Sequence, residues 1–117
     1  MRRDPRAYLW DAQAAVDRIL EFTRGRSLDD YLADAMLRAA VERQFEIIGE
    51  ALSQLAKAAP SIAQRIPDIG EIVGFRNVLI HGYATVDDGT VWRTVKDDLA
   101  GLRNRLGELL SELGGTP

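Results

Sequence analysis

The residues best suited to chemistry in this chain lie in one short stretch, Arg76-Asn77-Val78-Leu79-Ile80-His81-Gly82-Tyr83. His81 is the only histidine, and no other side chain of the chain titrates near neutral pH in its unperturbed form. Arg76 supplies a permanent, planar cation that matches the geometry of phosphate oxygens. Phosphodiester chemistry is indicated, because a general acid or base, a phosphate ligand and the phenol of Tyr83 lie close together in the sequence.

Each of these residues also has a purely structural interpretation. A histidine followed by glycine at a helix end is commonly a C-terminal cap, because the helix dipole favours its charge. Arg76 is equally compatible with a surface residue whose aliphatic stem is packed. Tyr83 is compatible with an aromatic side chain packed on the end of a bundle. A lone arginine–histidine pair is weak evidence for a catalytic site, so the choice between a catalytic and a structural role depends on the rest of the chain.

Length and residue types limit the kinds of site that the chain can build. Its 117 residues are enough for one domain, residues 1–117, with a real hydrophobic core. Cysteine is absent, which excludes a disulfide framework, a thiolate nucleophile and a cysteine-based metal site. A single histidine also excludes a histidine-rich zinc site within one chain. We therefore expect neither a metal nor a cofactor.

The charge balance gives no support for broad binding to a phosphate backbone. The net charge is −3, from 15 Lys+Arg against 18 Asp+Glu, whereas nucleic-acid binders usually carry a basic excess. Lysines are scarce (Lys57 and Lys96), and the arginine bias favours local, geometrically defined anion contacts. Arg2 and Arg3 precede no apolar run, and no apolar stretch approaches the roughly 20 residues of a membrane span. We expect a soluble, cytoplasmic protein.

Apolar residues recur at intervals of three and four along the chain, which predicts helices, and no alternating strand pattern competes with that prediction. Asp4-Pro5 should cap a first helix of about 18 residues that stops near Gly25. The segment 27–30 resembles a capping box and should open a short second helix. Asp34 should cap a long third helix, which Pro60 closes.

The remaining pattern predicts two further helices. The fourth should start at Pro67-Asp68, end at Gly82 and bury four apolar residues: Ile69, Ile72, Val73 and Leu79. The fifth should follow Asp87-Asp88-Gly89 and end at Gly114-Gly115. We interpret the two aspartates as turn and cap residues rather than as a magnesium site. Short connections between substantial helices predict an all-α, antiparallel bundle of four to five helices.

Gly49 lies inside the predicted third helix, where glycine costs about 1 kcal/mol relative to alanine. Such a glycine usually permits the close approach of another helix, although it can also expose the backbone to a ligand. Glu46 and Glu50 lie four residues apart on one helix face. Carboxylates in this arrangement are usually solvated, so we favour that interpretation over a catalytic or metal-binding pair.

Three segments together resemble one family of proteins. Phe45-Glu46-Ile47-Ile48-Gly49-Glu50-Ala51, then residues 74–83, then Val91-Trp92 are similar in residues, order and spacing to the HepT-type toxins of the HEPN superfamily. The resemblance runs from the first predicted helix to Leu110, and the Arg-Asn-x-x-x-His-x-Tyr string is its most specific part. Relatives often carry an aromatic residue just before the fourth helix, where this chain has residues 66–68.

The resemblance implies a HEPN-like helical bundle, a homodimer whose two motifs meet in one cleft, and catalysis of RNA cleavage by Arg76 and His81. It places Asn77 at the polar position next to the arginine. It also places Tyr83 at the tyrosine that a partner nucleotidyltransferase antitoxin, MntA, modifies with AMP. On a regular helix Arg76 is offset from His81 by about 140°, so one chain does not obviously converge both groups on one phosphate. Pairing of two chains, or unwinding of the helix near Gly82, would resolve this mismatch.

The resulting hypothesis is RNA cleavage without a metal, in a toxin–antitoxin system of type VII. The substrate's 2′-hydroxyl would attack phosphorus, His81 would act as general base or acid, and Arg76 would stabilise the phosphorane oxygens. Asn77 would position His81 or a phosphate oxygen, and AMP on Tyr83 would block the cleft by charge and volume. The alternative is a non-catalytic binding module that docks a nucleotidyltransferase or a nucleotide. A purely structural bundle is a third interpretation.

Overall fold

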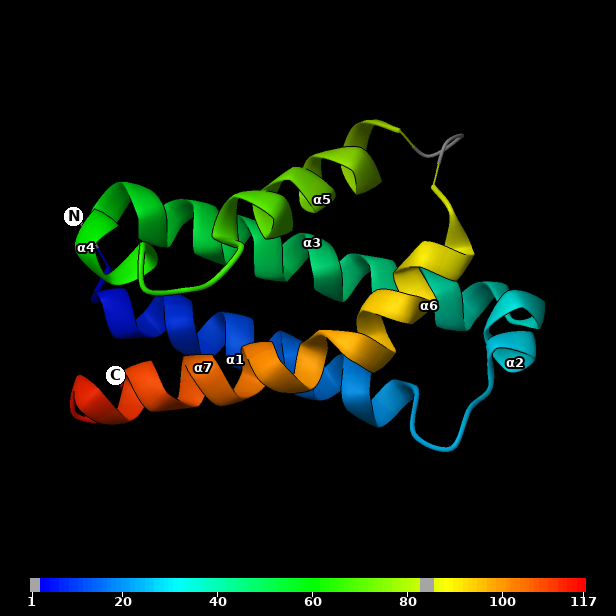
Figure 1. The fold of residues 1–117 in the computed structure, drawn as a ribbon, viewed down its shortest axis with the longest axis horizontal. Coiled ribbons are helices and arrows are strands. Elements are labelled where there is room, and N and C mark those ends of the chain that lie inside the picture. The colour runs from blue at the N-terminus through cyan, green and yellow to red at the C-terminus, as the bar shows by residue number, and fades with distance from the viewer. Residues whose placement is uncertain (1–2, 83–85) are drawn as a thin grey trace.

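The computed structural model describes residues 3–82 and 86–117, and all regular structure in these two ranges is helical (Figure 1). The predicted all-α class is therefore confirmed. The elements are α1 (Pro5–Phe22), α2 (Leu28–Ala33), α3 (Ala35–Ala58), α4 (Pro60–Ala63), α5 (Ile69–His81), α6 (Asp88–Asp97) and α7 (Leu99–Glu112). The long helices α1, α3, α5 and α7 run in alternating directions, as the colour gradient of Figure 1 shows.

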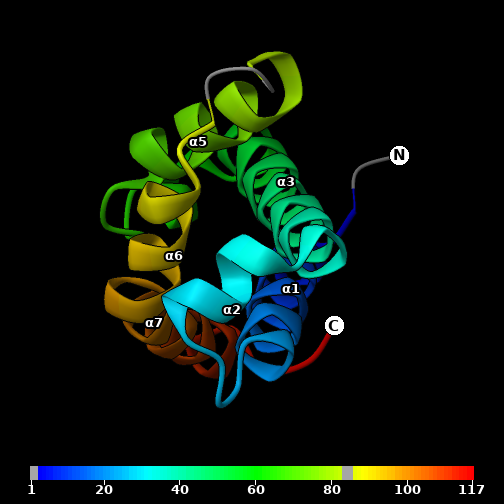
Figure 2. The same cartoon turned by 90° about the vertical axis from the view of Figure 1, so that its right-hand side faces the viewer.

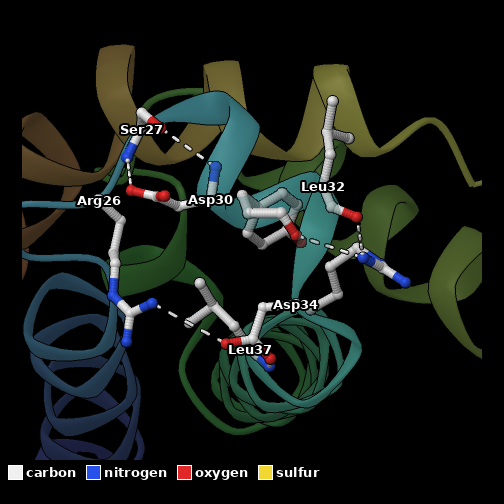
Figure 3. Close-up of polar contacts among 8 residues, drawn as sticks. Arg26, Ser27, Asp30, Leu32, Asp34 and Leu37 are labelled. Carbon is white, nitrogen blue, oxygen red and sulfur yellow. Dashed lines mark hydrogen bonds and ion pairs between the residues drawn. The ribbon is translucent and has the colours of Figure 1, made fainter.

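The predicted starts of α1, α2 and α3 are confirmed, and each has a local side-chain cap. The Asp4 carboxylate accepts a hydrogen bond from the Arg6 amide at the start of α1, and Pro5 occupies the first helical position. Ser27 and Asp30 form the reciprocal capping box of α2, and Asp34 accepts from the Leu37 amide to start α3 (Figure 3). Caps of this kind each contribute about 1 kcal/mol.

The structure differs from the sequence prediction at two connections. Pro60 does close α3, but it also begins the short helix α4, because proline is favoured at a first helical position, where no amide donor is needed. The predicted fifth helix is two helices that break at Asp98. The break lets α6 pack on α2 while α7 packs on α1. The apolar stripe continues across Asp98, so the periodicity carried no sign of this break.

The hydrophobic core lies where α1, α3 and α7 meet, and Figure 2 shows these helices end-on. The pair α1–α3 forms the largest helix contact, and α7 covers α1. The fully buried residues of the hydrophobic core include Leu9, Val16, Ile19, Val41, Ile48, Leu52, Leu55, Leu106 and Leu109. Truncating one of these leucines to alanine would cost about 2–5 kcal/mol.

The helix α5 is less buried than the sequence predicts. Leu79 is buried, but the predicted core residues Ile69, Ile72 and Val73 are only partly covered. The physical reason is that α5 packs mainly on α3 and leaves its other sides open. No helix in the described ranges is long and apolar enough to cross a membrane.

Candidate functional site

Three of the four candidate residues, Arg76, Asn77 and His81, lie on the second half of α5. The helix ends at Gly82, as predicted, and the Gly82 amide donates to the Val78 carbonyl at 2.8 Å. The fourth candidate, Tyr83, lies outside the described residues. The open helix α5 therefore determines the geometry of the described part of the site.

Arg76 points toward α3, where it forms an ion pair with Glu50. Its Nη2 lies 2.8 Å from Glu50 Oε2, and its Nη1 donates to Asn77 Oδ1 at 2.9 Å. The Nε atom is buried and has no hydrogen-bond partner among the described residues. One contact from each terminal nitrogen thus fixes the orientation of the guanidinium, and each of these nitrogens keeps one further N–H for a ligand. Half-exposed ion pairs contribute about 0–1 kcal/mol, so Glu50 orients Arg76 more than it stabilises the fold.

Gly49 makes this arrangement possible by bringing the two helices together. A Cβ atom at Gly49 would lie 2.2 Å from Arg76 Cβ and 2.7 Å from Arg76 Cγ. Real carbon contacts lie at about 3.5–4.0 Å, so no side chain fits between α3 and α5 at this point. The prediction that Gly49 permits a close helix approach is confirmed, and the helix that approaches is the one that carries Arg76.

His81 occupies the last turn of α5 and is exposed. Within the described ranges, its imidazole forms no hydrogen bond or ion pair, and nothing there joins it to Arg76. This position leaves the ring accessible to a substrate and close to the negative end of the helix dipole. The expected angular separation of Arg76 and His81 persists, because α5 is helical across both residues.

The two glutamates of α3 have different surroundings. Glu46 lies 3.2 Å from Arg43 on its own helix and is only 24% exposed, so it is less solvated than the sequence predicts. Glu50, however, is part of the Arg76 arrangement, and the sequence prediction missed this role. Its position next to Gly49 was a weak signal: Glu50 is turned by about 100° from Gly49, but its long side chain can still reach the second helix. No group of three or more potential metal ligands is present among the described residues.

A second polar cluster lies where α2, α3 and α6 meet. The Tyr31 hydroxyl is buried without a hydrogen-bond partner among the described residues, and burial raises the pKa of this phenol. Burial, then the charges of Asp88 and Glu46, raise the pKa of Glu42. Arg38 lies 3.6 Å from Asp88 and partly offsets the negative charge.

Asp87 has the cap role that the sequence predicts. Its carboxylate accepts hydrogen bonds from the Thr90 hydroxyl at 2.9 Å and from the Gly89 amide at 3.0 Å. The bond from Thr90, and then that from Gly89, lower the pKa of this carboxyl. The segment before α6 is therefore built for capping the helix.

Comparisons with known proteins show the family of this chain. The family model described as "Ribonuclease HepT-like" matches residues 12–109. The chain is 37% identical over 109 residues to the "Probable ribonuclease HepT" of Thermococcus cleftensis, covering 93% of this chain and 98% of the relative. It is 31% identical over 116 residues to a "Putative RNase" of Methanocaldococcus jannaschii, covering 97% and 93%.

A third relative extends the set to another organism. The chain is 32% identical over 110 residues to a "Putative RNase" of Caldanaerobacter subterraneus, covering 94% of this chain and 97% of the relative. No solved structure gives a significant match. The family match covers most of the chain, including α3 and α5, which meet at Gly49 and Arg76. The chain belongs to the HepT-like ribonuclease family.

Proposed function

We propose that this protein is the cytoplasmic toxin of a toxin–antitoxin system and that it cleaves RNA without a metal ion. The observation that supports this most strongly is the arginine arrangement on α5. Arg76 is oriented by Glu50 and Asn77, yet each of its terminal nitrogens keeps one N–H for a phosphate oxygen. An exposed histidine lies on the same helix. Family membership supports ribonuclease activity in general.

In the proposed reaction the 2′-hydroxyl of the RNA attacks the adjacent phosphorus. His81 accepts the proton of the attacking hydroxyl or donates one to the leaving 5′ oxygen, and Arg76 stabilises the charge on the phosphorane oxygens. The phosphorus–oxygen bond to the 5′ oxygen breaks, and a 2′,3′-cyclic phosphate remains. The reaction needs one proton acceptor and one proton donor, whereas each chain supplies one histidine.

A homodimer provides the second histidine. We infer that two α5 helices pack near a two-fold axis, so that His81 of one chain and Arg76 of the other act on one phosphate. Val78 and Ile80 support this arrangement, because they flank the motif and are 46% and 40% exposed. Apolar side chains of this size, left open on one helix, are suited to an interface between chains. The predicted dimer also removes the angular mismatch within a single helix.

The proposed control of the toxin is the transfer of AMP to Tyr83 by a nucleotidyltransferase antitoxin of the MntA type. Tyr83 follows His81 by two residues in the sequence, so added AMP would bring a bulky anion next to the cleft. Substrate phosphates would then be excluded by charge and by volume. The same partner forms the toxin–antitoxin complex in this proposal.

RNA cleavage in the presence of EDTA tests the proposed chemistry. The purified protein should cleave RNA, and the products should end in a 2′,3′-cyclic phosphate that phosphatase alone does not remove. His81→Ala and Arg76→Ala should each abolish cleavage while the protein stays folded. Strict dependence on magnesium, or cleavage of a substrate that lacks 2′-hydroxyls, would contradict the mechanism.

The second candidate function is a non-catalytic binding module, and one observation favours it. Within one chain, Arg76 is already paired with Glu50 and makes no described contact with His81. In this alternative, the motif docks a nucleotidyltransferase or a nucleotide. Failure of the purified protein to cleave RNA would support this alternative, provided that the protein binds the nucleotidyltransferase and that His81→Ala loses this binding.

A further inference from the structure

The open side of α5 borders an apolar groove that the proposed chemistry does not use. The groove has a volume of about 620 Å³ and lies between α5 and the junction of α6 with α7. Neither Arg76 nor His81 lines it. Its apolar floor and walls come from α3, α5 and α7: Phe45, Ile48, Ile72, Phe75, Leu99 and Leu102.

The groove is elongated, because one wall is a face of α5 and the other runs across the break at Asp98 from α6 to α7. On α5 the lining residues are 68, 71, 72 and 75, and on α6–α7 they are 94, 97, 98, 101, 102 and 105. Intervals of three and four residues mark one helical face on α5 and a stripe that continues from α6 onto α7. At 1.5 Å per residue these walls extend for about 10 and 16 Å, which is two to three turns of a helix.

Unpaired carboxylates line the rim of this groove. Asp68 and Glu71 lie on the α5 wall, Asp97 and Asp98 lie on the opposite wall, and all four are exposed. None of these carboxylates forms a hydrogen bond or ion pair with another described residue. Arg105 is the only basic residue among the described lining, and its Nη1 already lies 2.9 Å from Glu108 Oε2. The rim is therefore negatively charged on both sides.

We propose that this groove binds a helical segment of a protein partner, with apolar side chains at positions i, i+3 or i+4, and i+7, and with lysines or arginines beside them. An amphipathic helix in an apolar groove is a common mode of peptide recognition, and basic residues would complement the carboxylates on both walls. RNA does not fit this site, because its phosphates would face four carboxylates. The groove is thus a protein-docking surface, separate from the RNA-cleaving residues.

The exposed leucines of α2 do not have the required chemistry. The chain carries a net charge of −3, and its exposed Leu28 and Leu32 lie beside Asp29 and Asp30. These carboxylates would repel the acidic rim. The net negative charge of the chain and the acidic rim together favour a basic segment of a different protein as the occupant.

A designed peptide tests the proposal. The probe is a helical peptide of about 14 residues (about 21 Å) with leucines at the anchor positions and arginines beside them. The control peptide keeps the leucines and replaces the arginines by glutamates. Binding to the full chain is measured by fluorescence anisotropy at low and high salt. We expect the arginine peptide to bind and its affinity to fall as salt is raised, and we expect the glutamate peptide not to bind.

Two glycine variants locate the binding site. Gly101 lines the groove and Gly70 lies on the opposite face of α5, and a Cβ atom at either position meets no atom within 4 Å. Gly101→Trp should fill the groove and weaken peptide binding by at least roughly tenfold, whereas Gly70→Trp should leave it unchanged. The double charge reversal Glu71→Lys with Asp97→Lys leaves two carboxylates against two lysines on the rim, so it should remove the preference for the arginine peptide.

RNA cleavage by the same variants separates this proposal from the proposed function. Gly101→Trp should cleave RNA as the unchanged protein does, because the groove contains no residue assigned to cleavage. Equal binding of both peptides, or unchanged binding by Gly101→Trp, would overturn the docking proposal whatever the cleavage result. Conversion of a dimer to a monomer by Gly101→Trp would also overturn it, since a second copy would then occupy the groove.

Discussion

Replacing Gly49 by alanine should push α3 and α5 apart at the point where Arg76 is held. The new Cβ atom would lie 2.2 Å from Arg76 Cβ, whereas carbon atoms in contact prefer about 3.5–4.0 Å. Cβ is attached directly to the backbone, so the clash cannot be relieved by rotating a side chain. The two helices must separate by about 1.5 Å, which would break the 2.8 Å contact between Arg76 and Glu50.

The expected effects of Gly49→Ala on stability and on activity differ in size. Overpacking costs about 1–3 kcal/mol, and replacing a helical glycine by alanine returns about 1 kcal/mol. We therefore expect the free energy of unfolding to fall by at most about 2 kcal/mol. A misplacement of about 1 Å in a catalytic group can cost about 100-fold in rate. Gly49→Ala should thus remain folded and lose about two orders of magnitude in RNA cleavage.

Urea unfolding followed by circular dichroism and initial rates on a labelled RNA measure the two effects. Gly74 is the matched control, because it lies on the same helix as Arg76 and a Cβ atom there meets nothing within 4 Å. Gly74→Ala should increase the free energy of unfolding by up to about 1 kcal/mol and should cleave RNA at the rate of the unchanged protein. If Gly49→Ala gains stability to the same extent and keeps its cleavage rate, the α3–α5 contact does not position Arg76.

Three further variants test separate parts of the site. Glu50→Ala should lower kcat for RNA cleavage roughly tenfold and change the free energy of unfolding by less than about 1 kcal/mol. Glu50→Gln should keep most of the activity, since its amide oxygen still accepts a hydrogen bond from Arg76. An equal loss of activity in both variants would exclude the orienting role of Glu50. Glu42→Gln should raise the free energy of unfolding more at pH 7 than at pH 4. The pKa of Glu42 is raised in the folded protein, so the contribution of this carboxyl to stability is present below its usual pKa and is lost as pH rises through the folded pKa. A change in stability that does not depend on pH would refute this prediction. Tyr83→Phe should cleave RNA but gain no AMP mass when it is co-expressed with the nucleotidyltransferase; AMP found on Tyr8 or Tyr31 of the unchanged protein would assign the modification elsewhere.

Features that depend on neighbouring residues could be predicted from the sequence. Ser27 and Asp30 cap α2 through groups three residues apart, so the motif itself contains the geometry. Gly82 likewise ends α5 where expected. Arg76 and His81 were recognisable by residue type and spacing, and their placement on one helix followed from the apolar pattern.

Features that depend on distant segments could not be predicted in the same way. The pairing of Glu50 with Arg76 joins two helices, and periodicity does not say which residues of those helices meet. The open side of α5 was missed for a related reason. Ile72 and Val73 have a pattern suited to burial, but burial also requires a helix to cover them, and α6 and α7 lie across a groove. The break at Asp98 arises from the different packing partners of α6 and α7.

The one-sided packing of α5 has a consequence for hydrogen exchange. This helix has a single buried apolar side chain, Leu79, and packs mainly against α3. The amides of α5 should therefore exchange by local opening, at a lower free energy than those of α1 and α3, which exchange only when the core unfolds. Any molecule that covers α5, whether a second chain or a docked helix, would slow this opening. Association would then order the helix that carries Arg76 and His81, so that binding and catalytic competence become thermodynamically linked.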